Sequence, residues 1–259
     1  MMRVIKVGGR AQERADLAPA LATAWSAKRG AMCLVHGGGD AVSALQRQLG
    51  VTPTFIDGRR VTGDADIAIL RMALSGAANK RLVSALVALG VRAVGISGED
   101  AGLIRADVAD EQLGRVGVPH SIEVPLLWSL LDAGFLPVIS PLGVDRASPD
   151  ARTLNVNADD AAAAIAVALG ADELVLVADV PGVRDADGLP FASLDLAGAS
   201  ALMASGIAAG GMHAKLQAAS FALTHGVARV RIGDLSAVED STRGTLLTTT
   251  LPVHVPSFA

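Results

Sequence analysis

Short apolar runs alternate with helically spaced segments along most of this chain. Two of the runs, residues 4–7 and 31–35, lead into consecutive glycines, and each is followed by a helical pattern. A parallel strand that ends in glycines leaves backbone N–H groups free at the start of the next helix, where an anion can be held. The runs lie about thirty residues apart, which suits adjacent strands joined by a crossover helix. We therefore expect a phosphate site made from two glycine turns, with Lys6 entering it.

The rest of the pattern continues this alternation. Predicted helices cover residues 12–28, 40–49, 64–89, 125–133, 158–169, 194–205 and 212–224. Further predicted strands cover residues 91–97, 135–140, 173–178 and 227–232. Ser75-Gly76 predicts a bend or break inside the longest helix. The order is typical of an α/β fold, a three-layer αβα sandwich around a mainly parallel, doubly wound sheet.

Two segments interrupt the alternation. Residues 52–62 contain Asp57-Gly58 between short strand-like stretches, which predicts a β-hairpin standing at the end of the sheet as a flap. Residues 103–123 are polar and rich in glycine, and we predict a second hairpin there.

No linker or low-complexity segment divides the chain. We predict one domain over residues 1–259 with two lobes, about 1–150 and about 151–259. The tail from Thr248 to Ala259 has no clear partner, and we expect it to fray.

Composition and charge argue against nucleic-acid and membrane partners. Apolar residues make up 51% of the chain, Tyr is absent, and the formal charge is −4, so neither base stacking nor a broad polyanion surface is favoured. The longest apolar run, residues 161–171, is too short to span a bilayer. The one cysteine, Cys33, is predicted to be a buried strand residue, and the chain starts without a secretory pattern. We expect a cytoplasmic protein.

Three charged residues occupy positions that need an explanation. Lys6 lies inside an apolar strand, where its charge is costly unless an anion meets it; an edge strand with the amine in water is the alternative. Lys215 falls in the predicted first turn of a helix, against the macrodipole, and a bound phosphate would account for that. Asp159 could orient both lysines or be an ordinary first-turn acid.

Other common nucleotide and hydrolase motifs are missing. The sequence has no G-x-x-x-x-G-K-[ST] loop, no G-x-G-x-x-G after a strand and no G-x-S-x-G elbow. Without such an elbow, the run from His36 to Gly39 is not expected to be a hydrolase oxyanion hole, and we predict a structural role for His36.

In combination, these motifs resemble the amino-acid kinase family, in the family's order and over nearly the whole chain. The matching residues are Lys6-x-Gly8-Gly9, His36-Gly37-Gly38-Gly39, Gly58-x-Arg60-Val61-Thr62, Asn79-Lys80, Asn155-Val156-Asn157-Ala158-Asp159, Asp179-Val180-x-Gly182 and Gly210-Gly211-Met212-x-x-Lys215. Within the family they are most similar to enzymes that use ATP to phosphorylate the side-chain carboxylate of N-acetyl-L-glutamate in arginine biosynthesis.

The resemblance implies a role for each matching residue. Lys6 and Lys215 would stabilise the transferring phosphoryl group from opposite sides, and Asp159 would hold both lysines. The acceptor would be bound by Gly38, Gly39, Arg60 and Asn155. ATP would be bound by Gly8, Gly9, Asp179, Gly182, Gly210 and Met212. Mg²⁺ would be bridged mainly by ATP oxygens, without a protein metal site.

This chemistry requires alignment and charge stabilisation more than proton transfer. The transition state of phosphoryl transfer is loose, so an enzyme mainly positions donor and acceptor and offsets charge. A carboxylate is already a nucleophile at neutral pH, so a general base is not required.

The chain also departs from the family pattern. Glu99 stands where relatives often have lysine, and Ala214 stands where proline is frequent. Arginine-inhibited members carry an additional N-terminal helix, for which this chain has no room before its first strand. We therefore expect a homodimer without arginine feedback, built on residues 64–89 and the neighbouring strand.

Two alternatives remain open at this point. A kinase of acetylaminoadipate, in lysine biosynthesis, differs by one methylene in its acceptor, which is worth only about 1–3 kcal/mol of discrimination. A non-catalytic nucleotide- or amino-acid-binding regulator is the other; the joint presence of Lys6, Asp159 and Lys215 argues against it.

Overall fold

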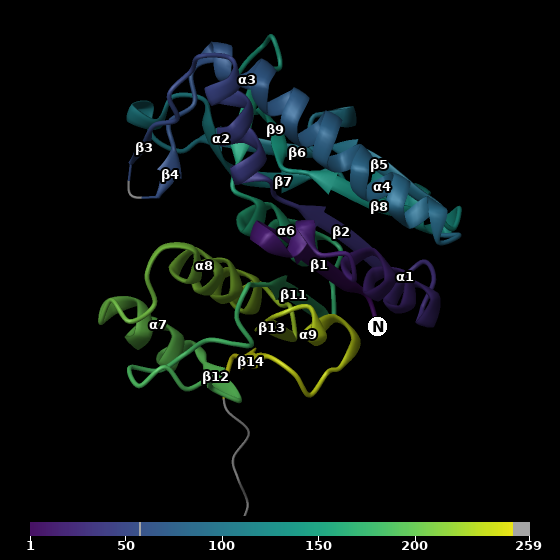
Figure 1. Cartoon of the computed structure of the whole chain (residues 1–259), viewed down its shortest axis with the longest axis vertical. Helices are drawn as coiled ribbons and strands as arrows, with labels where there is room; N and C mark the ends of the chain where they lie inside the picture. Colours follow the sequence, from purple (N-terminus) through teal and green to yellow (C-terminus); the bar gives the residue numbers. More distant parts are fainter. Residues whose placement is uncertain (57, 251–259) are drawn as a thin grey trace, which may run out of the picture.

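The computed structural model describes residues 1–56 and 58–250, so Asp57 and residues 251–259 of the predicted tail lie outside the described part. A central sheet has eight strands: β1 (Arg3–Val7), β2 (Met32–His36), β5 (Ala93–Ser97), β8 (Leu136–Ser140), β11 (Glu173–Val177), β12 (Ser193–Asp195), β13 (Arg229–Gly233) and β14 (Thr245–Thr248). Their spatial order is β12-β14-β13-β11-β1-β2-β8-β5, and only the β13–β14 pair is antiparallel. The sheet is therefore mainly parallel, as predicted (Figure 1).

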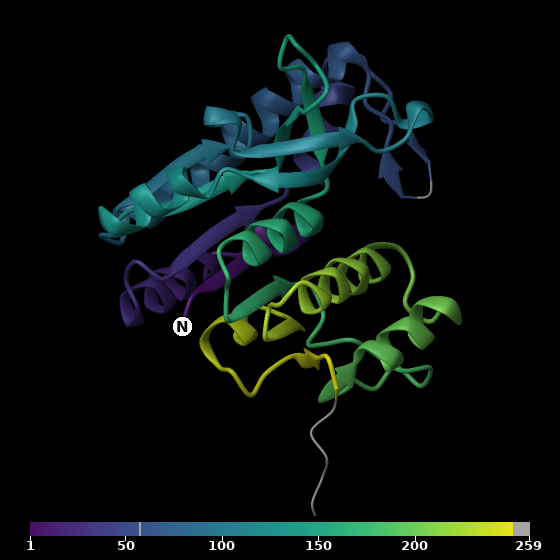
Figure 2. The ribbon, with the colours of Figure 1, turned by 180° about the vertical axis from the view of Figure 1, so that it is seen from behind.

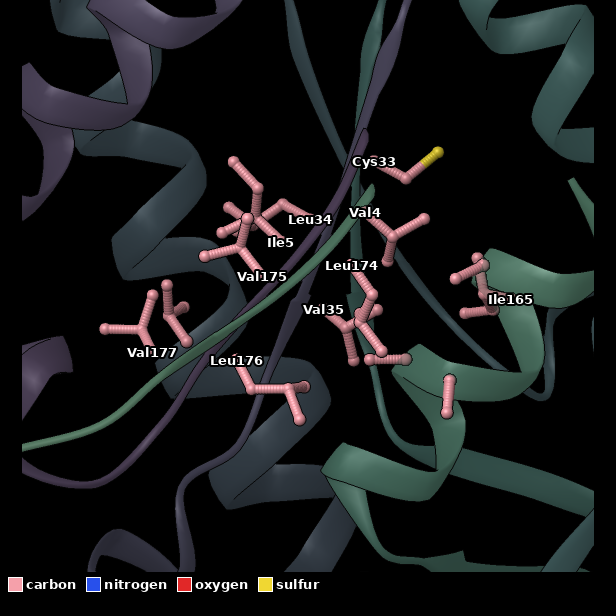
Figure 3. Packing of buried hydrophobic residues seen from close by; sticks show 14 of the residues in the cluster. Val4, Ile5, Cys33, Leu34, Val35, Ile165, Leu174, Val175, Leu176 and Val177 are labelled. Carbon is pink, nitrogen blue, oxygen red and sulfur yellow. The ribbon is translucent and has the colours of Figure 1, made fainter. Parts of the chain in front are cut away.

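The centre of the sheet is buried on both faces. Ile5 of β1 lies in register with Leu34 of β2 and with Val175 of β11, and all three are fully buried. In Figure 3 these three side chains lie on one side of the strands, and Cys33 and Ile165 lie on the other. Cys33 is buried, as predicted. Continuous runs of β-branched and leucine residues are what a parallel sheet covered on two sides requires.

Helices cover both faces of this sheet (Figures 1 and 2). On one face α1 (Leu17–Ala27) packs with α4 (Asn79–Ala88) and α9 (Ser236–Glu239), and on the other α6 (Ala158–Ala168) packs with α8 (Gly210–Thr224). Two further helices, α5 (Val124–Asp132) and α7 (Leu196–Ala204), pack against β8 and β12. No helix among the described residues has the length and apolar character needed to cross a membrane.

The long predicted helix over residues 64–89 is continuous but not uniform. It consists of α3 (Asp64–Leu70), a π-helical segment η2 (Arg71–Ala78) and α4. The wide turns of η2 contain Ser75-Gly76, where the sequence predicts a bend. The preceding helix, α2 (Gly39–Gln48), packs against η2 and α3.

A closed four-stranded barrel accompanies the sheet. It is formed by β6 (Ile104–Val108), β7 (Val116–Ile122), β9 (Leu142–Asp145) and β10 (Thr153–Val156). The antiparallel pair β6–β7 is the second predicted hairpin. The first is the pair β3 (Phe55–Ile56) and β4 (Arg59–Arg60), whose turn residue Asp57 is not among the described residues.

The structure differs from the sequence predictions in several details. The helix expected over residues 12–28 is interrupted: a 3-10 turn, η1 (Gly9–Glu13), comes first, and Arg14 is extended before α1 begins. Two further 3-10 turns, η3 (Asp100–Gly102) and η4 (Glu111–Leu113), flank β6. The strand expected to be last, β13, is followed by α9 and β14, and neither β9, β10 nor β12 was predicted.

Candidate active site

An open cavity of about 250 Å³ lies at the carboxyl ends of β1 and β2, where both glycine turns meet. Residues of the β3–β4 hairpin, the end of β10 and the start of α6 complete its wall. The predicted site residues that line it are Lys6, Gly8, Gly38, Gly39, Arg60, Asn155 and Asp159. Residues from distant parts of the sequence thus line one cavity, at the carboxyl ends of the strands, where parallel α/β folds bind ligands.

Lys6 and Asp159 line this cavity, and Lys215, which is outside its lining, joins them through Asp159 in a lysine–aspartate cluster. The Nζ atom of Lys6 is 3.0 Å from Oδ1 of Asp159, and the Nζ atom of Lys215 is 3.1 Å from Oδ2. The three side chains are only 8%, 7% and 12% exposed, respectively. With both lysines protonated, the cluster carries one net positive charge, which suits an anionic ligand.

Burial and charge act in opposite directions on this cluster. Burial disfavours the ionised carboxylate of Asp159, but the charges and hydrogen bonds of Lys6 and Lys215 prevail, and its pKa lies below the ordinary value. Burial, reinforced by repulsion from Lys6, lowers the pKa of Lys215, while Asp159 opposes that decrease. The carboxylate is thus held ionised between its two partners.

Helix capping places Asp159 in the first turn of α6, as predicted. The Oδ1 atom of Asn157 accepts hydrogen bonds from the N–H groups of Asp159 and Asp160, at 2.8 and 3.3 Å. The positive end of the helix dipole favours a carboxylate there. Lys215 differs from its prediction: α8 begins at Gly210, so Lys215 lies in the second turn rather than the first. Its position follows from the packing of α8 on α6 and not from the helix end.

The glycines are required by close approaches at two positions. A Cβ atom on Gly8 would overlap the ammonium of Lys6, so only glycine allows that side chain to lie over the turn. At Gly38 the backbone has φ +152°, and a Cβ atom would lie 2.7 Å from Cδ2 of Leu74. In each glycine turn, a residue of the cavity wall therefore occupies the space that a side chain would need.

His36 connects the glycine turn after β2 to Asn79 of α4 through hydrogen bonds. Its Nδ1–H donates to the carbonyl of Gly37 at 2.9 Å, and its Nε2 accepts from Nδ2 of Asn79 at 3.1 Å. Burial is the main reason that the pKa of His36 falls to about 4, so the ring is neutral near pH 7. These contacts agree with the structural role expected for it.

Arg60 is anchored to α2 on the cavity wall. Its guanidinium donates to Oγ of Ser43 at 2.7 Å, to the carbonyl of Gly39 at 3.0 Å and to the side chain of Gln46. It also lies 4.8 Å above the ring of Phe55. Burial lowers the pKa of this arginine. A guanidinium oriented in this way suits a carboxylate ligand.

Asn155 lies on another part of the same wall. Its Nδ2 donates to Oγ1 of Thr62 at 3.0 Å. Asn155 itself pairs with Val116 of β7, and Thr62 forms an isolated bridge with Gly114. Its carboxamide is therefore held where it lines the cavity.

The other predicted nucleotide residues lie outside this cavity. Gly9 begins η1, and Gly210 and Met212 lie in the first turn of α8. Asp179 is exposed after β11. Gly182 is buried where a Cβ atom would lie 2.6 Å from Oγ1 of Thr245. Their roles remain predictions.

Several contributing residues were not predicted. Ser43 and Gln46, which hold Arg60, are buried polar residues on α2. The available signal was that they are spaced to lie on the same helix face as the apolar Val42. Glu99, the departure from the family pattern, accepts from Arg71 and from Oγ1 of Thr153, both at 2.6 Å. That loop is therefore tied to η2 and β10.

Comparisons with known proteins agree on a family. A sequence model described as "Amino acid kinase family" matches residues 1–234. An acetylglutamate kinase of Roseiflexus sp. (strain RS-1) is 41% identical over 254 residues, 97% of this chain and 95% of that protein. An acetylglutamate kinase of Chloroflexus aurantiacus is 40% identical over 240 residues, 92% of this chain and 93% of that protein.

Solved structures resemble the whole described fold. The smu.665 protein of Streptococcus mutans superposes with a TM-score of 0.85 at 29% identity, over 96% of this chain and 99% of that one. The N-acetylglutamate synthase of Neisseria gonorrhoeae, solved with coenzyme A and N-acetyl-glutamate, superposes with a TM-score of 0.80 at 26% identity, over 97% of this chain and 60% of that one.

Proposed function

The chain belongs to the amino acid kinase family, and on that premise we propose that it transfers a phosphoryl group from ATP to the side-chain carboxylate of N-acetyl-L-glutamate. The product would be N-acetyl-L-glutamyl 5-phosphate, in the second step of arginine biosynthesis. One observation carries the proposal: Asp159 is shared by two buried lysines beside a cavity that also presents Arg60 and Asn155. The similarity to acetylglutamate kinases supports this choice of acceptor.

The lysine–aspartate cluster would perform the charge stabilisation. Lys6 and Lys215 approach Asp159 from β1 and from α8, so they can contact the phosphoryl group from two sides. An oxygen of the acceptor carboxylate forms a bond to the γ-phosphorus while the bond from that phosphorus to ADP breaks. Negative charge on the transferring group is offset by the two ammonium groups, which Asp159 keeps in place.

The donor set fits an anionic phosphate chain. Glycine-turn N–H groups and two lysines are typical phosphate ligands, while both oxygens of Asp159 already accept from lysine. ATP would supply the phosphoryl group, and Mg²⁺ bound with it would offset the charge of its phosphates. We assign Gly8, Gly9, Asp179, Gly182, Gly210 and Met212 to the ATP side.

The acceptor would lie against the opposite wall of the cavity. We assign its α-carboxylate to Arg60 and Asn155, and its reacting carboxylate to the backbone of Gly38 and Gly39. In this arrangement the β3–β4 hairpin is a flap over the acceptor. The hairpin's Phe55, Gly58 and Arg60 line the cavity, which supports that assignment.

We also propose a cytoplasmic homodimer of single-domain chains. The acceptor would be bound mainly by the lobe of about residues 1–150, with Asn155 added from the other lobe, and ATP mainly by the lobe of about residues 151–259, with Gly8 and Gly9 added from the first. The dimer contact would involve η2, α4 and β5. Met72, Val87 and Leu89 on or beside those helices are 50%, 52% and 49% exposed, and β5 is the last strand of the sheet on its side. Exposed apolar side chains beside an open strand suit a contact between copies.

The test is an acyl-phosphate assay with hydroxylamine trapping. The purified chain is incubated with ATP and Mg²⁺ and with acetylglutamate, acetylaminoadipate or free glutamate, and the Asp159→Asn variant is the matched control. We expect kcat/KM to be highest for acetylglutamate and strongly reduced in the variant. A higher kcat/KM for acetylaminoadipate would assign the other pathway. Binding of ATP without turnover of any acid would indicate a regulator and overturn the kinase proposal.

A further inference from the structure

The two arginines of the β3–β4 hairpin contact different parts of the molecule. Successive side chains of a strand point to opposite sides, and Arg60 is bound to α2 through Ser43 and Gly39. The neighbouring Arg59 instead places its Nη2 atom 3.9 Å from Oδ2 of Asp160, in the first turn of α6. The hairpin therefore contacts α2 through Arg60 and α6 through Arg59.

Asp160 is suited to retain a cation. Its side chain is 22% exposed, and burial, together with the charge of Asp159, raises its pKa to about 6 while Arg59 opposes that increase. Within the described part of the chain, Arg59 is the only ion-pair partner of this carboxylate. A partly buried carboxylate has lost some of its hydration, so the nearby guanidinium of Arg59 stabilises the hairpin in this position.

The position of Arg59 also separates two hollows. It lines the cavity described above and, on its other side, a second hollow of about 230 Å³ between β7, α6 and α8. The walls of the second hollow include Val118, Ala164 and Phe221. The Arg59 side chain thus contributes to the walls of both hollows, and it lies on the hairpin side of each.

We propose that Arg59 and Asp160 form a latch that keeps the hairpin closed against α6 and thereby fixes Arg60 over the acceptor. Both are positioning residues, since they act through the hairpin and through Arg60. The kinetic consequence rests on the proposed function. The contact itself does not, so the two can be tested separately.

The kinetic test is a double-mutant cycle with Arg59→Ala, Asp160→Asn and their combination. Each single change is expected to raise KM for acetylglutamate by about three- to tenfold and to leave kcat within about twofold, since the lysines are untouched. The combination should be no worse than the worse single variant. Arg146→Ala, which breaks a surface pair with Asp107 on the barrel, is the matched control and should keep the wild-type KM. Additive effects, or an unchanged KM, would overturn the latch.

A second measurement does not depend on turnover. The amide of Val61 donates to the carbonyl of Thr54 at 2.9 Å and reports on hairpin order. Hydrogen exchange over residues 54–62 should accelerate severalfold in Asp160→Asn, with no change in β1. If the wild-type chain phosphorylates none of the acids but the variant shows this acceleration, the latch stands and the proposed function fails. Normal turnover with unchanged exchange and unchanged KM would reject the latch alone.

Discussion

The ammonium of Lys6 lies 3.0 Å from the carboxylate of Asp159, so the first strand of the sheet and the first turn of α6 share a buried charge pair. Lys215 binds the same carboxylate from α8. Removal of either lysine leaves Asp159 paired with the other, so the cluster can lose one cation and keep a compensated carboxylate. The contribution of each lysine to phosphoryl transfer can therefore be measured in a folded protein.

Lys6→Ala and Lys215→Ala should each lower kcat by at least about 100-fold, because each removes a charge that offsets the transferring phosphoryl group. The Kd for acetylglutamate, measured by calorimetry, should stay within about threefold, since neither lysine is assigned to the acceptor. Lys28→Ala, at an exposed position after α1, is the control. Full kcat in the Lys215→Ala variant would remove that residue from the mechanism.

Gly8→Ala should act through the lysine beside it. The new Cβ atom would overlap the ammonium of Lys6, and the flexible side chain would have to leave its place near Asp159. We expect kcat to fall by about tenfold or more, while the melting temperature changes little because only the end of one side chain moves. Unchanged kcat at an unchanged melting temperature would contradict this geometry.

Ser43→Ala tests the anchoring of Arg60. The serine hydroxyl accepts a hydrogen bond from that guanidinium at 2.7 Å. The variant removes this acceptor and leaves the guanidinium less firmly oriented. We expect KM for the acceptor to rise about threefold with kcat unchanged, and Arg60→Ala to raise KM by about 100-fold. Ser26→Ala, at an exposed site on α1, should match the wild type. An Arg60→Ala variant with normal KM would place the acceptor elsewhere.

His36 makes stability depend on pH in a defined direction. Its pKa is lowered to about 4 in the folded protein, below that of an unfolded histidine, so the unfolded chain binds the proton first as the pH falls. The stabilisation is complete above about pH 6.5 and decreases toward pH 4, by about 2 kcal/mol between pH 6.5 and 5.

Urea unfolding at several pH values measures this effect. A His36→Asn variant should show a smaller loss of unfolding free energy over that interval than the wild type. The exposed His225→Asn should behave like the wild type. Equal losses in wild type and His36→Asn would show that another group is responsible.

Most strands and helices of the central sheet, and both hairpins, could be predicted because short sequence windows contain their signals. Buried strands are visible as short apolar runs, and the helices as apolar residues at helical spacing. The hairpins are marked by their turn residues. The strands β9, β10, β12 and β14 have at most four residues each and are defined by pairing with distant segments. Barrel closure in particular depends on β10 contacting β7 and β9, which no short window contains.

The candidate site was predicted where glycine and charge coincide. Lys6, Asp159 and the glycine turns stand out because a charge or a flexible residue occurs in an apolar setting. Ser43 and Gln46 carry no such signal, since a polar residue on a helix is usually exposed, and their partner Arg60 is on another element. The start of α8 was predicted at residue 212, but the helix begins at Gly210. Lys215 was therefore predicted in the first turn and lies in the second.

The short path from β10 into α6 has a consequence for how such a protein can change its acceptor in evolution. Asn155 ends on the cavity wall, Asn157 caps the helix and Asp159 holds the lysines, all within one five-residue stretch. A mutation that reshapes the acceptor wall at Asn155 also shifts the carboxylate on which the lysines depend. The hairpin carries Arg60 on a separate segment, which contacts the first turn of α6 through the side chain of Arg59. Adaptation to a longer or shorter acid is therefore expected to occur first in the hairpin, with β10 preserved.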